Sequence, residues 1–186
     1  MGMITKKGKQ TKILQLGDPT LEQISAPTKA EDIDSAKIKT TIKDMQTAVR
    51  SQYDGIAISA PQIGKLYRIF LISNRIYEVL GEEKEKAEKR KDLIFINPRI
   101  TKFSKEKAWV EEGCLSVKNI FGRVQRSKKV SVEAVDENNN KISRGFSGIL
   151  AQIVQHENDH LDGILFVTKA KDLQEILPPE ESVQTL

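Results

Sequence analysis

The sequence of 186 residues contains little cysteine, histidine or aromatic side chain, and each shortage excludes a class of protein. A single cysteine cannot form an internal disulfide, so the chain is not a disulfide-stapled domain. No apolar run approaches the length that spans a bilayer, and residues 1–12 are basic without the apolar core of a signal peptide. We therefore expect a cytoplasmic protein that has no membrane contact.

Aromatic residues make up only 5% of the chain, although its net charge is +4 and its isoelectric point is near 9.0. No basic helix and no stacking motif accompanies this charge, so the sequence does not predict a DNA-binding protein. A lysine-rich, solvated surface explains the basic balance. A weak attraction to a polyanion such as ribosomal RNA is compatible with it, so a transient association with the ribosome stays open.

The scarce residues gather in two short segments. Both histidines lie in the segment His156-Glu157-Asn158-Asp159-His160, and the only cysteine is Cys114. Residues four positions apart share one face of a helix, so two imidazoles can converge on one metal ion. Three protein ligands with one open position are typical of a hydrolytic metal site, and the neighbouring Glu157 is placed to handle the proton of a metal-bound water. An isolated HExxH is a common accident and a lone cysteine is usually a core residue, but their coincidence favours a catalytic metal centre.

A third segment, residues 55–64, is rich in small residues and contains Gln62. Small side chains permit a close approach of the backbone, and the amide of Gln62 can donate a hydrogen bond to a carbonyl oxygen. A backbone N–H near Leu115 can act beside it. Small residues before a proline also form ordinary turns, so this segment alone is weak support for a catalytic role.

Hydrophobic periodicity predicts an α+β domain. We expect a helix over residues 34–53 and a final helix over 148–161, capped by Ser147 and stopped by Gly163. Strands are expected over 13–16, 67–72, 93–96, 129–135 and 141–146, in antiparallel or mixed sheets around the C-terminal helix that carries HExxH. Residues 1–186 form one domain in this interpretation, with a solvated loop or exposed helical turn at 81–91. In the tail at 171–186, Leu173, Ile176 and Leu177 suggest a helix that two prolines end.

In their order and approximate spacing, the three segments resemble the signature motifs of peptide deformylase. The first is the small-residue run ending in Gln62, the second is Glu-Gly-Cys-Leu-Ser at residues 112–116, and the third is Gln-His-Glu-x-Asp-His-Leu-x-Gly at residues 155–163. The resemblance also includes residues 17–21 and Asn97-Pro98, so it extends over most of the chain to about Thr168.

This resemblance implies a metal-dependent hydrolase that removes the formyl group from N-formylmethionyl peptides and releases formate. It implies that Cys114, His156 and His160 bind the metal, with Glu157 as general acid/base and with Gln62 and the Leu115 amide as carbonyl stabilisers. The implied native ion is Fe²⁺, and Zn²⁺ or Ni²⁺ can occupy the same ligands. We further expect a monomer.

The chain departs from the family pattern in two places. Ala57 and Ser59 replace other small residues in the first motif, and Phe121 stands where the family has an arginine near the substrate. An extended formylated peptide could add as a strand beside residues 55–57 and the backbone near Gly113, with an apolar slot for methionine. The residues that we expect to bind substrate are Gly55, Ile56, Ala57, Val110, Gly113, Phe121, Ile149 and Ile153. Arg126 and Asp159 are a candidate supporting pair behind the last helix, or two unrelated surface charges.

Two other functions are compatible with parts of the sequence. A metallopeptidase with HExxH would normally take its third ligand downstream of the helix, and the upstream position of Cys114 disfavours it. A catalytically inactive relative of the family could bind nascent chains without turnover. Such a protein would normally have lost a metal ligand or the general base, and this sequence retains all of them. The altered residues 118–121 are the one feature that favours an inactive relative.

Overall fold

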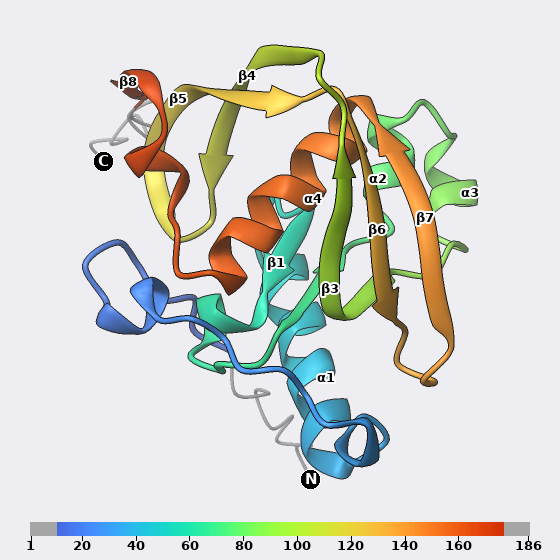
Figure 1. Ribbon diagram of the computed structural model, residues 1–186. Helices are drawn as coiled ribbons and strands as arrows, with labels where there is room; N and C mark the ends of the chain where they lie inside the picture. Colours follow the sequence, from blue (N-terminus) through green and yellow to red (C-terminus); the bar gives the residue numbers. More distant parts are fainter. Residues whose placement is uncertain (1–10, 177–186) are drawn as a thin grey trace, which may run out of the picture.

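The computed structural model describes residues 11–176, which fold into two antiparallel sheets with a long helix between them (Figure 1). The helices are α1 (Ala36–Arg50), α2 (Ile76–Val79), α3 (Lys84–Ala87) and α4 (Gly148–Leu161), with short 3-10 turns η1 (Pro19–Glu22), η2 (Ala30–Asp32), η3 (Ala60–Ile63) and η4 (Phe166–Thr168). The strands are β1 (Ala57–Ser59), β2 (Ile69–Ile72), β3 (Leu93–Phe103), β4 (Lys107–Cys114), β5 (Val117–Ser127), β6 (Lys129–Val135), β7 (Lys141–Ser147) and β8 (Lys171–Glu175). This arrangement confirms the α+β class.

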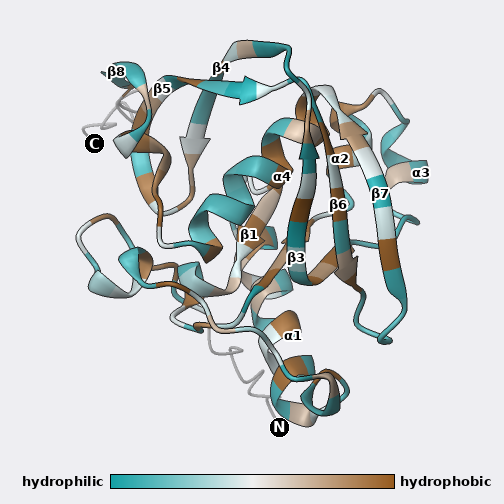
Figure 2. Cartoon of the chain, in the orientation of Figure 1, coloured by the Kyte–Doolittle hydropathy of each residue, from teal (hydrophilic) through white to brown (hydrophobic). Residues whose placement is uncertain are grey.

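The five-stranded sheet has the order β1-β2-β3-β6-β7 and carries helices on two faces. Strand β2 reads Ile-Phe-Leu-Ile because both of its faces are buried: Ile69 and Leu71 pack toward α1, whereas Phe70 and Ile72 pack toward α4. Figure 2 shows the amphipathic character of α1, which carries both hydrophobic and hydrophilic positions. The predictions of α1 and β2 are therefore confirmed, with slightly shorter bounds.

Helix α4 lies between the two sheets and contacts strands of both (Figure 1). Its Ala151, Val154 and Leu161 join the core cluster formed with Phe70, Phe95 and Phe146. The helix was predicted over the same residues, but Ser147 makes no capping hydrogen bond with its side chain, contrary to expectation. Gly163 has a φ of 72°, a left-handed conformation that suits glycine where the helix ends. The packed helix gives any side chain that projects from it a fixed position.

Several strand predictions need correction. Residues 13–16 form no strand, although Leu14 N–H donates to Gln62 O at 2.8 Å and Leu16 N–H donates to Ser116 O at 2.7 Å. Strand β3 does not end at Asn97-Pro98 but runs to Phe103, since a register shift between Ile96 and Arg99 accommodates the proline. Strands β6 and β7 are confirmed, and a polar turn at residues 136–140 joins them.

The three-stranded sheet, in the order β4-β5-β8, was largely missed. Charged residues at many exposed positions of β4 and β5 obscure the alternation that identifies a strand. Strand β8 replaces the helix suggested for the tail and pairs antiparallel with β5, while Leu177 lies outside the described residues. The charged segment at 81–91 contains one short helix, α3, as the second of its two alternatives predicted. Within residues 11–176, no helix is long and apolar enough to cross a membrane.

Candidate metal centre

Both imidazoles project from one face of α4, one helical turn apart. The ring centroids of His156 and His160 lie 4.9 Å apart, with their planes at 79°. His160 is almost fully buried, and His156 is slightly exposed toward a cavity. The helical spacing noted in the sequence therefore places two nitrogen donors side by side.

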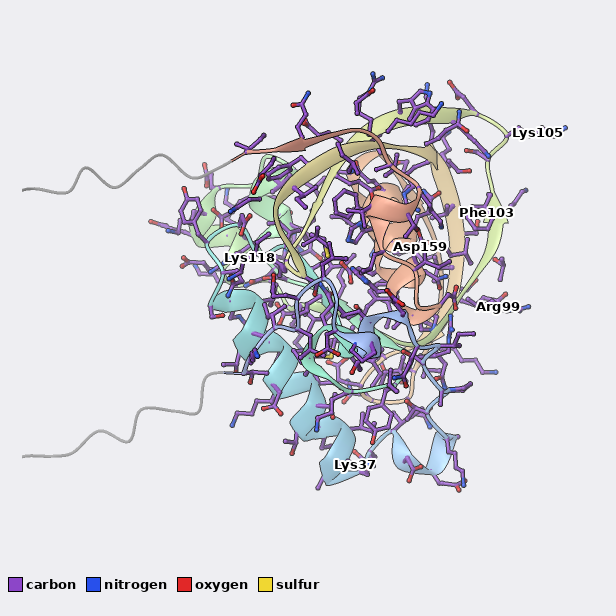
Figure 3. All side chains as sticks on the ribbon, turned by 90° about the vertical axis from the view of Figure 1, so that its left-hand side faces the viewer. Lys37, Arg99, Phe103, Lys105, Lys118 and Asp159 are labelled. Atoms are coloured by element: carbon purple, nitrogen blue, oxygen red, sulfur yellow. The ribbon has the colours of Figure 1, made fainter. Side chains whose placement is uncertain are left out.

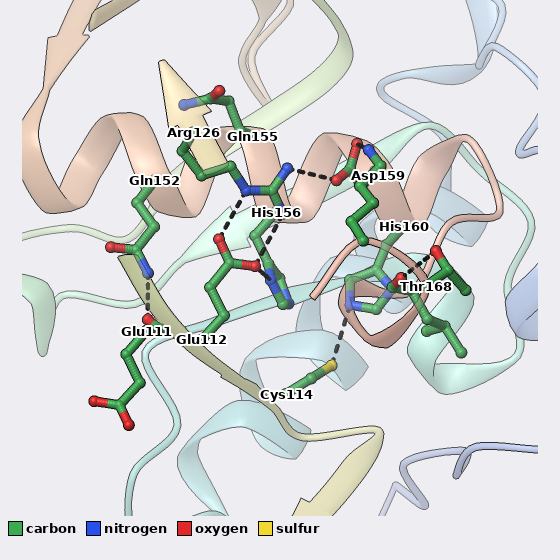
Figure 4. Close-up of polar contacts among 12 residues, drawn as sticks. Glu111, Glu112, Cys114, Arg126, Gln152, Gln155, His156, Asp159, His160 and Thr168 are labelled. Carbon is green, nitrogen blue, oxygen red and sulfur yellow. Dashed lines mark hydrogen bonds and ion pairs between the residues drawn. The ribbon is translucent and has the colours of Figure 1, made fainter. Parts of the chain in front are cut away.

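Cys114 reaches the same place from the other sheet. It is the last residue of β4, and a register shift between Glu112 and Cys114 precedes its pairing with Val117. The Sγ atom of Cys114 lies 3.2 Å from Nε2 of His160 (Figure 4). One ligand atom from each of Cys114, His156 and His160 lies within 4.8 Å of the others, and no other such group of His, Cys, Asp or Glu occurs among residues 11–176.

The chemistry of this donor set fits a transition metal. One thiolate and two imidazoles suit Fe, Zn or Ni better than Mg or Ca, which prefer oxygen ligands. Burial and the charge of His156 hold the pKa of His160 well below its usual range, which leaves a lone pair available. Burial alone would lower the pKa of His156, but hydrogen bonds to Cys114 and Glu112 raise it well above its usual range. The anionic groups that retain a proton on His156 also favour a bound cation.

A network of buried charges fixes the orientation of His156 (Figure 4). The Nδ1 atom of His156 lies 2.9 Å from Glu112 Oε2, which leaves its Nε2 atom for the metal. Arg126 donates to Glu112 from Nε at 2.7 Å and from Nη2 at 2.9 Å, and to Asp159 from Nη1 at 2.6 Å. Burial acts to raise the pKa of Glu112, but Arg126 and His156 lower it to about 2, so its carboxylate is ionised.

The contact between Arg126 and Asp159 was one of two alternatives at the sequence level, and the structure contains it. Lys169 extends the network by donating to the other oxygen of Asp159 at 2.7 Å. The role of Glu112 was missed, although Glu112 belongs to the second motif. The signal was its position two residues before Cys114, since alternate residues of a strand point to the same face.

Glu157 is buried beside the candidate metal ligands and lines a cavity. Burial raises the pKa of its carboxyl to about 7, an effect that the charge of His156 only partly offsets. Its Oε2 atom has no hydrogen-bond partner in the part of the chain that the structure describes. A buried carboxyl oxygen without a protein partner is available to a water molecule or a substrate atom.

Gln62 points its amide nitrogen toward the candidate metal ligand Cys114. Its Oε1 atom accepts hydrogen bonds from Ser59 N at 2.8 Å and from Ser59 Oγ at 3.0 Å. Its Nε2 atom donates to Ser116 Oγ at 3.1 Å and lies 3.5 Å from Cys114 Sγ. The hydroxyl of Ser59, a departure from the family pattern, thus helps to fix the amide. Leu115 lies in the turn between β4 and β5, and its carbonyl accepts from Gln15 Nε2 at 3.0 Å.

A cavity of about 480 Å³ opens onto these groups. Six of the expected substrate-binding residues line it, namely Ile56, Ala57, Gly113, Phe121, Ile149 and Ile153. Gly55 and Val110 are not among its lining residues: Gly55 packs against α1, where a Cβ would lie 2.1 Å from Val49 O, and Val110 pairs with Val124 in the sheet. The polar lining residues Gln52, Asp54, Glu111, Lys118, Asn119 and Gln152 were missed, because they come from separate elements that only the fold brings together.

Phe121 lies directly over Gly113. A Cβ on Gly113 would come within 2.7 Å of the Phe121 ring, so this contact requires glycine. The departure at position 121 therefore changes the cavity wall next to the backbone of Cys114, whereas the contacts among the candidate metal ligands do not involve it.

Comparisons with known proteins point to one family. Residues 10–175 match the family model described as polypeptide deformylase. The chain is 40% identical over 157 residues to a peptide deformylase of Psychrobacter cryohalolentis, covering 83% of this chain and 76% of that protein. It is 38% identical over 154 residues to a peptide deformylase of Treponema pallidum, covering 83% and 84%.

Solved structures give the same result for the fold. The actinonin-bound crystal structure of class I type b peptide deformylase from Acinetobacter baumannii has a TM-score of 0.75 and 31% identity, covering 88% of this chain and 99% of that one. The peptide deformylase structure from Thermotoga maritima has a TM-score of 0.73 and 30% identity, with the same coverage.

Proposed function

The chain belongs to the polypeptide deformylase family, whose members remove the N-terminal formyl group from nascent polypeptides, and we propose that Cys114, His156 and His160 are its metal ligands and Glu157 its general acid/base. One observation carries this assignment. The thiol of Cys114 and the imidazoles of His156 and His160 place one ligand atom each within 4.8 Å of the others. Beside them Glu157, whose buried Oε2 has no hydrogen-bond partner within residues 11–176, lines one cavity together with Cys114 and His156.

The ion that we propose natively is Fe²⁺, with Zn²⁺ or Ni²⁺ able to occupy the same ligands in purified protein. The mixed thiolate and imidazole donors support an ion of this group. When bound, such an ion lowers the pKa of water and polarises a carbonyl oxygen.

The protein groups transfer the proton and stabilise the developing negative charge. Glu157 accepts a proton from the attacking water and delivers it to the nitrogen that leaves with the peptide. Gln62 Nε2 and the Leu115 N–H donate to the carbonyl oxygen of the formyl group as negative charge develops there. The hydrogen bonds from Ser59 support this role of Gln62, because they hold its amide in one orientation before the substrate binds.

The substrate would bind as an extended chain between two sheet edges. Strands β1 and β4 are terminal in their sheets, so each has a free edge toward a peptide. The backbone of Ala57 and Gly113 would face that peptide. Gly55, which is buried against α1, would support this edge from behind, and Val110 would support β4 from within the sheet. Ile56, Phe121, Ile149 and Ile153 provide the apolar surface that a methionine side chain needs.

We propose further that residues 1–186 act as one catalytic domain in the cytoplasm, as a monomer that associates transiently with the ribosome. The substrate supports this location, because a formylated N-terminus is present on the polypeptide as it is synthesised. The chain's net charge of +4 supports attraction to ribosomal RNA.

The test is formate release from a formyl-Met peptide by protein prepared without oxygen, with metal analysis of the same sample. Glu157→Ala should retain one metal ion per chain and lose about 10²–10⁴-fold in turnover, the contribution of a general acid/base. Glu78→Ala, a change at an exposed position of helix α2 that does not line the cavity, is the matched control and should leave turnover unchanged. Full activity in Glu157→Ala would contradict the assigned role, and loss of metal from that variant would assign Glu157 to the ligand set instead.

A further inference from the structure

A second cavity, of about 470 Å³, lies on the five-stranded sheet and shares no lining residue with the first. It spans the neighbouring strands β3, β6 and β7. The opposite face of these strands packs on α4 through Val130, Val132 and Phe146. The groove is lined by eight residues, of which Val130 and Phe146 belong to the buried core. The other six are called the sheet groove below: Lys102, Ser104, Lys129, Ser131, Gly145 and Ser147.

The strand register explains why this surface is hollow. Lys102 pairs with Ser131, which pairs with Gly145, so one row across three strands carries a single long side chain. In the next row, Lys129 pairs with Ser147, and Ser104 Oγ accepts from Lys129 N at 3.0 Å. The two rows therefore carry two lysines, and their other positions hold only serines and one glycine, which have short side chains or none.

Neither packing nor backbone conformation requires this glycine. A Cβ on Gly145 would meet only Val130 O, at 3.9 Å, and the φ of Gly145 is not positive. A glycine inside a strand weakens it, and such positions often mark a close approach by another molecule. The missing side chain keeps the centre of the groove open.

The groove carries the positive charges of Lys102 and Lys129. Lys102 and Lys129 form no ion pair with any residue in the described range 11–176. The nearest acidic residues along the strands are already paired: Glu133 with Arg99 at 2.7 Å, and Glu106 with Lys128 at 2.5 Å. Lysine and serine side chains over an open backbone are typical donors to phosphate oxygens.

Figure 3 shows where this surface lies relative to the active-site cavity. Arg99 and Lys105, on and just after β3, project from the right of the view, whereas Lys118 of the active-site cavity lies on the left. A ligand in the sheet groove would therefore leave the first cavity free for a peptide.

We propose that the sheet groove binds the phosphate backbone of RNA. RNA is the polyanion that surrounds a nascent polypeptide, so this inference rests on the ribosome association proposed above and names the surface that makes it. Lys102 and Lys129 neutralise phosphates, and the hydroxyls of Ser131 and Ser147 donate to phosphate oxygens, while Ser104 Oγ already donates to Glu106 O at 2.8 Å. Contacts of this kind bind without base specificity.

The experiment compares charge reversals at two places on the full chain. Lys102→Glu with Lys129→Glu changes the groove. Lys43→Glu with Lys65→Glu makes the same change of net charge elsewhere, at exposed lysines that form no ion pair with another residue of the described range. Binding of a fluorescent, structured RNA is titrated from about 50 to about 200 mM salt. The groove variant should bind at least about tenfold more weakly, with the slope of log affinity against log salt reduced by about 1 for each lysine, while the control retains most of its affinity.

A third variant tests the groove without changing charge. Gly145→Gln fills the open centre of the groove and should weaken RNA binding several-fold while it leaves thermal unfolding and formate release unchanged. Equal losses in the groove and control pairs, or no loss in Gly145→Gln, would overturn the proposed surface. Binding of phosphatidylglycerol vesicles in place of RNA, with the same dependence on Lys102 and Lys129, would also overturn it.

Formate release in the same samples separates this inference from the catalytic assignment. The groove variants should turn over formyl-Met peptide at the wild-type rate, and Glu157→Ala should bind RNA normally. Cosedimentation with ribosomes tests the association itself: wild-type protein that binds RNA through the groove but never ribosomes would contradict the association while the groove stands.

Discussion

Arg126 offers the sharpest test of how the buried charges support the metal centre. The Arg126→Met variant keeps the volume of the side chain and removes its charge. Arg126 side-chain exposure is 6%, and its partners Glu112 and Asp159 are 2% and 14% exposed. Removing one partner of a buried pair costs about 3–5 kcal/mol, because the remaining charge stays buried without compensation.

For Arg126→Met we expect the lower part of the range of about 3–5 kcal/mol. Asp159 retains Lys169 at 2.7 Å, so Glu112 is the carboxylate left with only His156 as a charged neighbour. We therefore expect the free energy of unfolding of Arg126→Met to fall by about 3 kcal/mol. Since Glu112 orients His156, metal affinity should also fall, by about 10–100-fold.

Urea unfolding of the metal-free and metal-loaded protein, with a competitive chelator titration, measures both quantities. Arg99→Met is the matched control, because its pair with Glu133 is 73% and 51% exposed and should contribute about 0–1 kcal/mol. Adding Glu112→Gln to Arg126→Met removes the isolated charge and should recover part of the lost stability. An effect of Arg126→Met no larger than that of Arg99→Met would refute the reasoning, as would unchanged metal affinity in a destabilised protein.

Two further predictions concern groups around the metal ligands. Gln62→Leu should retain metal and lose about 10²–10³-fold in kcat, the contribution of one donor to a developing oxyanion, whereas a rise in KM at constant kcat would show that Gln62 only binds substrate. Gly113→Ala should raise KM for formyl-Met peptides, because the new Cβ would lie 2.7 Å from the Phe121 ring, and Phe121→Leu in the same chain should restore KM. A restored KM would show that the steric contact between residue 113 and the Phe121 ring caused the defect. An equally raised KM in the double variant would show that the backbone at Gly113 is itself required.

The sequence was sufficient to predict those helices and strands that have a regular spacing of apolar residues within the segment itself. Helices α1 and α4 and strand β2 follow from the spacing of apolar residues, and the two histidines share a face because they lie four residues apart on α4. The deformylase family was likewise recognisable, because its three motifs are short and contiguous. Each of these features depends only on residues that are close together in the sequence.

Secondary-structure prediction from local sequence was wrong where hydrogen bonds to a distant segment determine the conformation. Leu14 and Leu16 donate their N–H groups to Gln62 O in η3 and to Ser116 O between β4 and β5, and residues 13–16 therefore form no strand. Residues 171–175 pair with β5 and therefore form a strand, although their apolar spacing suggested a helix. In both cases a partner far along the chain supplies the hydrogen bonds that local propensity cannot anticipate.

The sequence by itself determined which donors the centre contains: one thiol, two imidazoles and a neighbouring carboxyl. Only the tertiary structure decided that Cys114 meets His160 from the other sheet, that Arg126 and His156 share Glu112, and that Glu157 has an oxygen without a protein partner. The physical reason is that donor identity is a property of the residue. Approach, burial and hydrogen bonding instead depend on strand register and on the packing of α4 between two sheets.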